Sequence, residues 1–208
     1  MLISNIAYRT FFILIGDYGT GFIVDVDGQE YLITAKHLLG TPDSDLKIYI
    51  NQRWTSYKYV VADFGANGAD IVALRLENPI VPSNLPVKVS GETYIGQDVC
   101  FLGFPYKLWM EHGAVTHGRP MPFLKKGVIS AFDNDPSILH LDAINNPGFS
   151  GGPVYYLDDE KNVVIIGVVA DYRIEREVVE AGDLKIEVPY NTGLMRAYRM
   201  QNFLSIKF

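Results

Sequence analysis

The chain has 208 residues, 48% of them hydrophobic and 20% charged, which is typical of a soluble globular protein and too apolar for a disordered one. This length allows one large domain or two small barrels that share an interface. The net charge of −6 argues against a nucleic-acid or anionic-membrane partner, because either would need a basic patch.

Most apolar segments are short, rich in β-branched and aromatic residues, and bounded by Gly, Asp, Asn or Pro, which predicts strands separated by turns, one of them at Asp27-Gly28. In the first half, strands are predicted at 9–15, 20–26, 30–34, 46–50, 57–62 and 71–76. The stretch 77–92 contains three prolines and is expected to be a connector. In the second half, strands are predicted at 98–102, 125–131, 137–142, 153–157, 163–170 and 185–189. The tail 194–204 has apolar residues at helical spacing and predicts a helix.

Short strands at this spacing indicate an all-β protein, either a sandwich or a barrel. The expected order is an N-terminal barrel over residues 1–80, a linker over 81–97, a C-terminal barrel over 98–192 and a C-terminal helix over 193–208. These parts are expected to form one unit.

The cysteine content and the N-terminal segment bear on location. Cys100 is the only cysteine, so no intramolecular disulfide can form, which favours a reducing compartment. The first residues lack the positive region and cleavage site of a secretory signal, and no apolar run approaches the roughly 18 residues that cross a bilayer. We therefore expect a cytoplasmic protein.

The segment 148–153, Gly-Phe-Ser-Gly-Gly-Pro, places Ser150 between glycines. A serine attacks a carbonyl only when a base takes its proton, and the resulting oxyanion needs N–H donors that converge at a tight turn. The glycines permit that turn and leave room for a substrate. Taken alone, the motif is more often an ordinary glycine-rich turn, so its meaning depends on its partners.

Chain order distinguishes two hydrolase classes. Four histidines precede Ser150, and none follows it: His37, His112, His117 and His140. This excludes a standard α/β-hydrolase, whose catalytic His follows the serine, and matches the order His, Asp, Ser of chymotrypsin-like enzymes. His37 ends a predicted strand and Asp70 begins another, positions that strand-end or capping residues also occupy. As a set with Ser150 they are candidates for base, orienting carboxylate and nucleophile.

The other histidines carry weaker signals. His112 and His117 lie in a predicted loop that is either solvated or flanks a cleft, and His140 is interpreted as structural. One cysteine and four scattered histidines show no ligand spacing, so no metal and no cofactor are expected.

Four segments in order resemble the trypsin-like peptidases, most closely the bacterial branch that includes the high-temperature-requirement proteases: 19–24, 33–37, 70–74 and 148–153. The resemblance implies a chymotrypsin-like double six-stranded β-barrel without a PDZ-like domain. It also implies a serine endopeptidase that cleaves peptides or proteins through an acyl-enzyme. His37 would then be the general base, Asp70 its orienting partner and Ser150 the nucleophile, with the N–H groups of Gly148 and Ser150 as the oxyanion hole.

Two residues depart from the family pattern. Lys36 precedes His37 where many members have a small residue, so its stem must reach solvent. Phe149 stands where secreted trypsins have an Asp that pairs with a new N-terminal ammonium. Because Phe cannot form that ion pair, activation by N-terminal trimming is not expected.

The resemblance also places the pocket for the residue before the scissile bond. Its walls are expected to include Ile144, Asn146, Val168, Val169 and Ala170. These side chains offer no partner to a buried charge, so small apolar residues are expected there unless the neighbouring Asp171 enters the pocket.

Two other functions stay open. One is a non-catalytic peptide-binding module on the same fold, and the other is a peptidase effector within a larger regulatory or defence assembly. An active-site probe distinguishes the first, and gel filtration with pull-down addresses the second.

Overall fold

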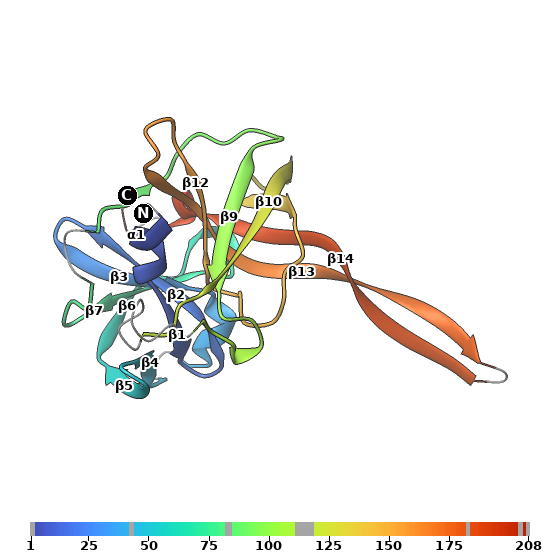
Figure 1. Cartoon of the computed structure of the whole chain (residues 1–208), viewed down its shortest axis with the longest axis horizontal. Coiled ribbons are helices and arrows are strands. Elements are labelled where there is room, and N and C mark those ends of the chain that lie inside the picture. Colours follow the sequence, from blue (N-terminus) through green and yellow to red (C-terminus); the bar gives the residue numbers. More distant parts are fainter. Residues whose placement is uncertain are drawn as a thin grey trace.

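Two sheets make up most of the chain (Figure 1). The computed structural model describes residues 3–41, 44–81, 85–110, 119–181, 184–203 and 206. Strands of the first sheet lie in the order β5-β4-β1-β2-β3-β7-β6, and those of the second in the order β12-β9-β10-β11-β14-β13-β8. An additional pairing between β12 and β13 closes six strands of the second sheet into a barrel. The predicted all-β class is therefore confirmed.

The strands of the first sheet are all antiparallel to their neighbours. Their bounds are β1 Thr10–Leu14, β2 Tyr18–Val26, β3 Gln29–Thr34, β4 Leu46–Ile50, β5 Arg53–Tyr57, β6 Tyr59–Asp63 and β7 Val72–Leu76. Asp27 and Gly28 join β2 to β3 with φ angles of 50° and 77°, as a tight hairpin turn with two left-handed residues requires. The Asp-Gly turn signal was thus correct, whereas β5 was not predicted.

The second sheet begins after the proline-containing connector. Its strands are β8 Lys88–Val89, β9 Asp98–Gly103, β10 Phe123–Phe132, β11 Ile138–Asp142, β12 Pro153–Leu157, β13 Val163–Ala181 and β14 Leu184–Arg199. The helical segments are α1 Ile3–Tyr8, η1 Lys36–Leu39, η2 Ala66–Gly68, η3 Pro105–Lys107 and η4 Met200–Asn202. No helix in the described ranges has the length and hydropathy to cross a membrane.

Three groups of buried apolar side chains hold the fold together. One fills the first sheet, with Ile23, Leu32 and Leu74, and another fills the closed barrel, with Phe101 and Leu141. The third joins the two sheets. Burial of such side chains is the main favourable term in folding, at roughly 25 cal/mol per Å² of apolar surface.

The third group packs the outer face of one sheet against the other. Phe22, Ile33 and Ile71 from the first sheet meet Leu102 and Ile165 from the second. Because these side chains are almost fully buried, the two sheets are fixed against each other. Residues at the line where the sheets meet are therefore held in a constant geometry.

The predicted C-terminal helix is wrong. β14 continues as a strand to Arg199, paired with β11 and β13, and in the described part of the tail only the single turn η4 follows it. Met195 and Ala197 are buried while Leu194 and Arg196 are exposed, so the true period is two residues. Apolar residues at this spacing fitted a helical pattern equally well over a short window. Residues 204 and 205 lie outside the described residues.

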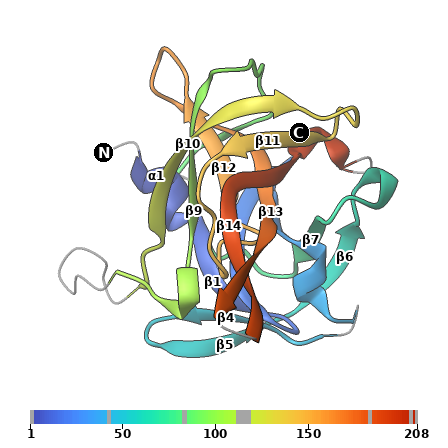
Figure 2. The same cartoon turned by 90° about the vertical axis from the view of Figure 1, so that its right-hand side faces the viewer.

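β13 and β14 extend far beyond the closed barrel as a two-stranded arm, at the right of Figure 1 and toward the viewer in Figure 2. Pairing along the arm runs from Ile174 with Asn191 to Ala181 with Leu184. The strands predicted at 163–170 and 185–189 correspond to parts of β13 and β14, but the prediction missed their length. Ile174, Val178 and Ile186 are each at least half exposed on the arm.

Candidate active site

The candidate residues lie where the two sheets meet, on three separate elements. His37 is in η1, directly after β3, and Asp70 directly precedes the segment that enters β7. β3 and β7 are antiparallel neighbours with Thr34 opposite Val72, so the end of one strand lies beside the start of the other. This register brings His37 and Asp70 together from 33 residues apart.

Asp70 holds His37 through two hydrogen bonds, one to the ring and one to the backbone. His37 Nδ1 lies 2.5 Å from Asp70 Oδ2, and the backbone N–H of His37 donates to Oδ1 at 2.8 Å. The hydrogen bond to Asp70 raises the pKa of His37, although partial burial opposes the shift. The carboxylate thus fixes the ring orientation and leaves the other nitrogen, Nε2, without a hydrogen-bond partner among the described residues.

Lys36, which departs from the family pattern, is accommodated beside this pair. Its side chain is exposed, and Nζ lies 5.3 Å from the centre of the Phe64 ring. Its backbone N–H donates to the carbonyl of Asp70 at 3.2 Å. The lysine therefore reaches solvent without displacing His37.

Ser150 lies in the loop before β12, and hydrogen bonds join this serine loop to both sheets. Its carbonyl accepts from the N–H of Thr20 at 3.0 Å, and its Oγ donates to the carbonyl of Ala170 at 3.0 Å. The next residue, Gly151, donates to the carbonyl of Val169 at 2.8 Å. The hydroxyl is thus bonded to β13 rather than to His37 in this structure.

Two glycines in this loop are required by their surroundings. Gly148 has φ of +102°, and a Cβ there would lie 2.2 Å from the carbonyl oxygen of Phe104. Gly151 has φ of +83°, and a Cβ there would lie 2.1 Å from the carbonyl oxygen of Thr20. A side chain at either position would collide with backbone, so the tight turn expected from the sequence depends on both glycines.

The backbone around Gly148 leaves two N–H groups available. The carbonyl of Pro147 accepts from the N–H of Tyr106 at 2.8 Å, and the carbonyl of Gly148 accepts from Thr20 Oγ1 at 2.6 Å. Since the carbonyl and N–H of a trans peptide point in opposite directions, the N–H of Gly148 is directed away from Tyr106. Within the described ranges, no acceptor takes the N–H of Gly148 or Ser150. Both groups are free to bind an anionic oxygen.

Thr20 is a part of the site that the sequence did not single out. Its side chain is fully buried, donates to the carbonyl of Gly148 and accepts from the N–H of Phe104 at 3.2 Å. One hydroxyl on β2 therefore links the serine loop to the chain after β9. The only signal in the sequence was its position within the segment 19–24.

Phe149, which cannot form the ion pair that an Asp forms at this position in secreted trypsins, anchors the loop that carries Ser150 by apolar packing. Its ring is fully buried in the closed barrel and packs edge to face on Phe101, with centroids 5.2 Å apart. Lys125 Nζ lies 5.3 Å from the same ring and donates to the carbonyl of Ile144 at 2.6 Å and to Asn146 Oδ1 at 2.5 Å. Burial lowers the pKa of Lys125. Apolar packing and this lysine hold the run that precedes Ser150.

The residues expected to form the substrate pocket are variously placed. Ile144 is 60% exposed, and the Asn146 side chain also donates to the Tyr106 hydroxyl at 3.2 Å. The strand residues expected to face the pocket, Val168, Val169 and Ala170, are fully buried. Their contribution to a pocket stays a prediction, and the backbone of β13 is the part that lies beside Ser150.

Asp171 carries a charge close to His37 but has its own partner. Arg196 Nε donates to Asp171 Oδ1 at 2.7 Å, and Arg196 Nη2 donates to Oδ2. The Asp171 charge contributes to the raised pKa of His37, after the larger effect of Asp70. Asp171 and Arg196 line a cavity of about 310 Å³ that His140 also borders.

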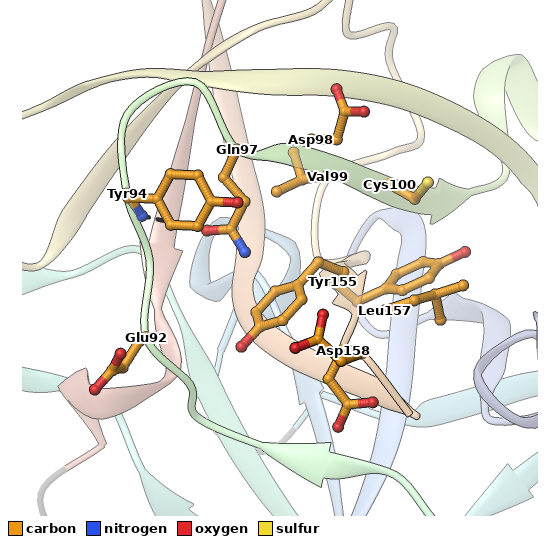
Figure 3. Close-up of a pocket in the computed structure, with 11 residues that line it drawn as sticks. Glu92, Tyr94, Gln97, Asp98, Val99, Cys100, Tyr155, Leu157 and Asp158 are labelled. Atoms are coloured by element: carbon orange, nitrogen blue, oxygen red, sulfur yellow. Dashed lines mark hydrogen bonds between the residues drawn. The ribbon is translucent and has the colours of Figure 1, made fainter. Parts of the chain in front are cut away.

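Other cavities also lie on the described surface. One, of about 620 Å³, has Glu92, Tyr94 and Gln97 on one side and Tyr155 and Asp158 on the other (Figure 3). None of His37, Asp70 and Ser150 lines it. A smaller cavity of about 330 Å³ borders Gly148, and so adjoins the candidate oxyanion hole. Of these two cavities, the smaller one adjoins the candidate site, at Gly148.

The remaining candidate residues show no catalytic cluster. His140 Nε2 lies 2.7 Å from Asp133 Oδ2, a local pair between the middle of β11 and the turn that precedes it. Burial raises the pKa of the Cys100 thiol, which disfavours the reactive thiolate. His112 and His117 lie outside the described residues. In the part of the chain that the structure describes, no group of three or more His, Cys, Asp or Glu side chains could hold a metal ion.

Comparison with known proteins places this geometry in context. The family model described as "Trypsin-like peptidase domain" matches residues 19–167. The chain is 30% identical over 141 residues to "Protease Do-like 1, chloroplastic" of Arabidopsis thaliana, covering 65% of this chain and 30% of that protein. It is 28% identical over 145 residues to "Probable periplasmic serine endoprotease DegP-like" of Hahella chejuensis, covering 68% of this chain and 28% of that protein. The chain thus spans under a third of the length of these relatives.

Among solved structures, the chain is similar to "Crystal structure of Rv3671c protease, inactive form". The TM-score is 0.63 at 18% sequence identity, over 97% of this chain and 88% of that chain. Such a likeness supports the chymotrypsin-like fold.

Proposed function

Since the chain belongs to the trypsin-like peptidase domain family, we propose that it is a serine endopeptidase acting on peptides or proteins. The observation that carries the proposal is the His37–Asp70 pair beside a serine loop whose N–H groups at Gly148 and Ser150 have no acceptor among the described residues. A base, its orienting carboxylate and free oxyanion donors together are what acyl transfer requires.

In the proposed reaction, His37 Nε2 takes the proton of Ser150 Oγ as the oxygen attacks the scissile carbonyl. The N–H groups of Gly148 and Ser150 donate to the developing oxyanion. His37 then gives its proton to the leaving amine, and the acyl group remains on Oγ. Water, deprotonated by the same imidazole, then attacks the acyl carbon. The carbon–Oγ bond breaks, the carboxylic acid leaves and His37 returns the proton to Ser150 Oγ.

The serine hydroxyl has to turn for this reaction to begin. In this structure Oγ donates to the carbonyl of Ala170, so its proton is directed away from His37. Rotation about the Cα–Cβ bond between staggered positions redirects the hydroxyl without moving the backbone. We propose that substrate binding along β13 engages the Ala170 carbonyl and releases the hydroxyl.

The same hydrogen bond favours a second candidate, a peptide-binding module with no catalysis. In that case the hydroxyl would stay on Ala170 and the fold would only hold an extended peptide. The two candidates differ in whether Ser150 reacts with an electrophile.

Labelling with a fluorophosphonate probe tests the proposal. The wild-type protein should be labelled at Ser150 and should cleave an unfolded protein substrate. Ser150→Ala should abolish labelling and lower turnover by about six orders of magnitude, as for a triad member that acts as a unit. The matched control is Ser130→Ala, because Ser130 is an exposed serine bonded to the carbonyl of His140 in the same barrel.

Ser130→Ala should behave as the wild type. A folded wild-type protein that binds peptides but takes up no probe would favour the binding module. Labelling that persists in Ser150→Ala would contradict the assignment of the nucleophile.

A further inference from the structure

The cavity of about 330 Å³ beside Gly148 has an aromatic interior and a charged rim. Phe12 and Phe104 are almost fully buried, with ring centroids 5.4 Å apart, and Tyr18 stacks on Phe12 at 5.8 Å. A volume at the small end of the range for ligand sites suits a single side chain rather than a cofactor. The surfaces inside therefore suit an apolar side chain, and an aromatic one above all.

The charged groups at the rim balance each other. Asp17 and Lys107 both line the cavity, and Lys107 Nζ lies 3.8 Å from the centre of the Tyr18 ring. One acidic and one basic group give a ligand no net charge to recognise. A charged side chain would lose its hydration inside the cavity and would find no group of opposite charge that is not already balanced. The cavity therefore disfavours charged side chains.

The turn that forms the rim is held in a strained conformation. Tyr106 and Lys107 have φ angles of +53° and +63°, two consecutive left-handed residues that are not glycine. Their N–H groups donate to the carbonyls of Pro147 at 2.8 Å and Phe104 at 3.2 Å. Backbone strain of this kind persists where surrounding contacts enforce it, and it gathers at ligand sites. Here it places the Tyr106 side chain, 62% exposed, at the cavity rim beside the oxyanion loop.

The position of the cavity relative to the scissile bond follows from its neighbours. The acyl part of a substrate lies toward β13, whose Ala170 carbonyl binds Ser150 Oγ, and no residue of β13 or β14 lines the cavity. The leaving amine takes its proton from His37, on the first sheet, which also supplies Phe12 and Tyr18. His37 itself does not line the cavity. The first leaving residue therefore adjoins His37, and the next, about 3.3 Å further along an extended chain, reaches the cavity.

We propose that this cavity binds the side chain of the second residue after the scissile bond and selects an aromatic or large aliphatic one. This inference rests on the proposed peptidase function and assigns specificity to the leaving-group side. It makes Phe12, Tyr18, Phe104 and Tyr106 the specificity-determining residues there.

Acyl transfer separates this inference from the function on which it rests. An activated ester, acetyl-alanine p-nitrophenyl ester, would form the acyl-enzyme and release p-nitrophenol. A dipeptide amide would then compete with water. Its amine nitrogen bonds to the acyl carbon, the carbon–Oγ bond of Ser150 breaks, and the amine proton returns to Oγ through His37. The ratio of transfer to hydrolysis reports only on how the acceptor binds.

Three acceptors locate the preference: Ala-Ala-NH₂, Ala-Phe-NH₂ and Phe-Ala-NH₂. We expect Ala-Phe-NH₂ to be transferred at least about tenfold better than Ala-Ala-NH₂, since even one methylene in an apolar pocket is worth a factor of about ten. Tyr106→Ala should reduce this ratio several-fold, and Tyr106→Phe should keep it. The control Tyr94→Ala removes a similarly exposed tyrosine that lines the larger cavity and should keep the wild-type ratio.

The outcomes are distinct. Absence of ester turnover in the folded protein would defeat the proposed function itself. Ester turnover with equal transfer to all three acceptors would overturn the inference alone. A preference for Phe-Ala-NH₂ over Ala-Phe-NH₂, or an equal loss of selectivity in Tyr94→Ala, would also overturn it.

Discussion

At the scale of single residues, the proposed reaction predicts that the hydrogen bond between His37 and Asp70 sets how activity depends on pH. Asp70 raises the pKa of His37, which is about 6.5 when unperturbed. Only the neutral imidazole can accept the serine proton, so a raised pKa moves the acid limb of the rate profile to higher pH. The protonated pair also stabilises the folded state at low pH, and this stability is lost as the pH rises through the folded pKa.

Asp70→Asn should therefore shift the acid limb of kcat/KM toward lower pH, and it should reduce kcat by about 10⁴, as the equivalent change does in trypsin. The measurement is the pH profile of peptide hydrolysis from pH 5 to 9, with folding followed by circular dichroism. An acid limb that stays in place in the variant would mean that Asp70 does not control the titration of the base.

Phe149 is the residue whose packing holds the serine loop, and its removal should affect both stability and activity. Phe149→Ala should lower the free energy of unfolding by about 3–5 kcal/mol, the cost of deleting a fully buried aromatic ring. Phe123→Ala is the matched control, because Phe123 is 42% exposed on β10 and should change stability by under about 0.5 kcal/mol. Urea unfolding of both variants measures the difference. Equal stabilities would contradict the claim that packing of Phe149 holds the serine loop.

At the scale of elements, Thr20 on β2 connects the two sheets, because its side chain bonds to Gly148 in the serine loop and to Phe104 after β9. Thr20→Val keeps the shape but leaves the carbonyl of Gly148 and the N–H of Phe104 without this partner. The N–H of Phe104 also donates to the carbonyl of Gly148 at 3.4 Å, so the two groups keep one long bond in the variant. We expect the free energy of unfolding to fall by about 0.5–1.5 kcal/mol for each hydrogen bond that is lost. Thr20→Ser should retain most of the lost stability, because the serine hydroxyl can make the same hydrogen bonds. In Thr20→Val, we expect kcat to fall by a larger factor than KM changes. A valine variant with wild-type kcat would show that the link has no role in the site.

The arm formed by β13 and β14 is expected to be dispensable for the chemistry. Residues 176–178 and 185–190 are exposed, and a two-stranded ribbon in solvent contributes little stability. Replacing residues 175–190 by Asn-Gly should keep ester hydrolysis within about twofold and Tm within about 5 °C, since few buried contacts are lost. A loss of ester hydrolysis with the fold intact would indicate that the arm shapes the site.

The elements also show which parts were predictable from sequence. Short apolar runs bounded by Gly and Asp located most strands, and the Asp27–Gly28 turn was correct. The tail around Met195 was mistaken for a helix, because pairing with β11 and β13, which is not local, decided its conformation. The full length of the arm was missed because Glu175, Arg176 and Glu177 form a charged run in β13, which interrupts the apolar pattern that predicts a strand.

The candidate site was predictable to a similar degree. His37, Asp70 and Ser150 were predicted from residue type and chain order, and the structure brings His37 and Asp70 into contact; the role of the three as a set stays a prediction. Thr20 and Lys125 were not found, since each acts through backbone carbonyls of a distant loop that no sequence pattern reveals. The aromatic cavity beside Gly148 combines residues from both sheets, so it exists only after the sheets have packed.

At the scale of the whole molecule, two sheets fixed by a shared apolar group form one rigid frame for the reaction. The first sheet supplies His37 and Asp70, and the loop of the second supplies Ser150 and Gly148. Because neither sheet contains the complete candidate set, the proposed reaction would depend on how the two are packed together. Under the same proposal, β13 would bind the acyl side of a substrate and the aromatic cavity its leaving-group side.

Formation of an acyl-enzyme on Ser150 tests this account most directly. With acetyl-alanine p-nitrophenyl ester in excess, mixing should give a burst of p-nitrophenol close to one equivalent of enzyme. Mass spectrometry of the quenched protein should then show one acetyl-alanyl group, on the peptide that contains Ser150. A folded protein that gives no burst, or an adduct on another residue that persists in Ser150→Ala, would contradict the account.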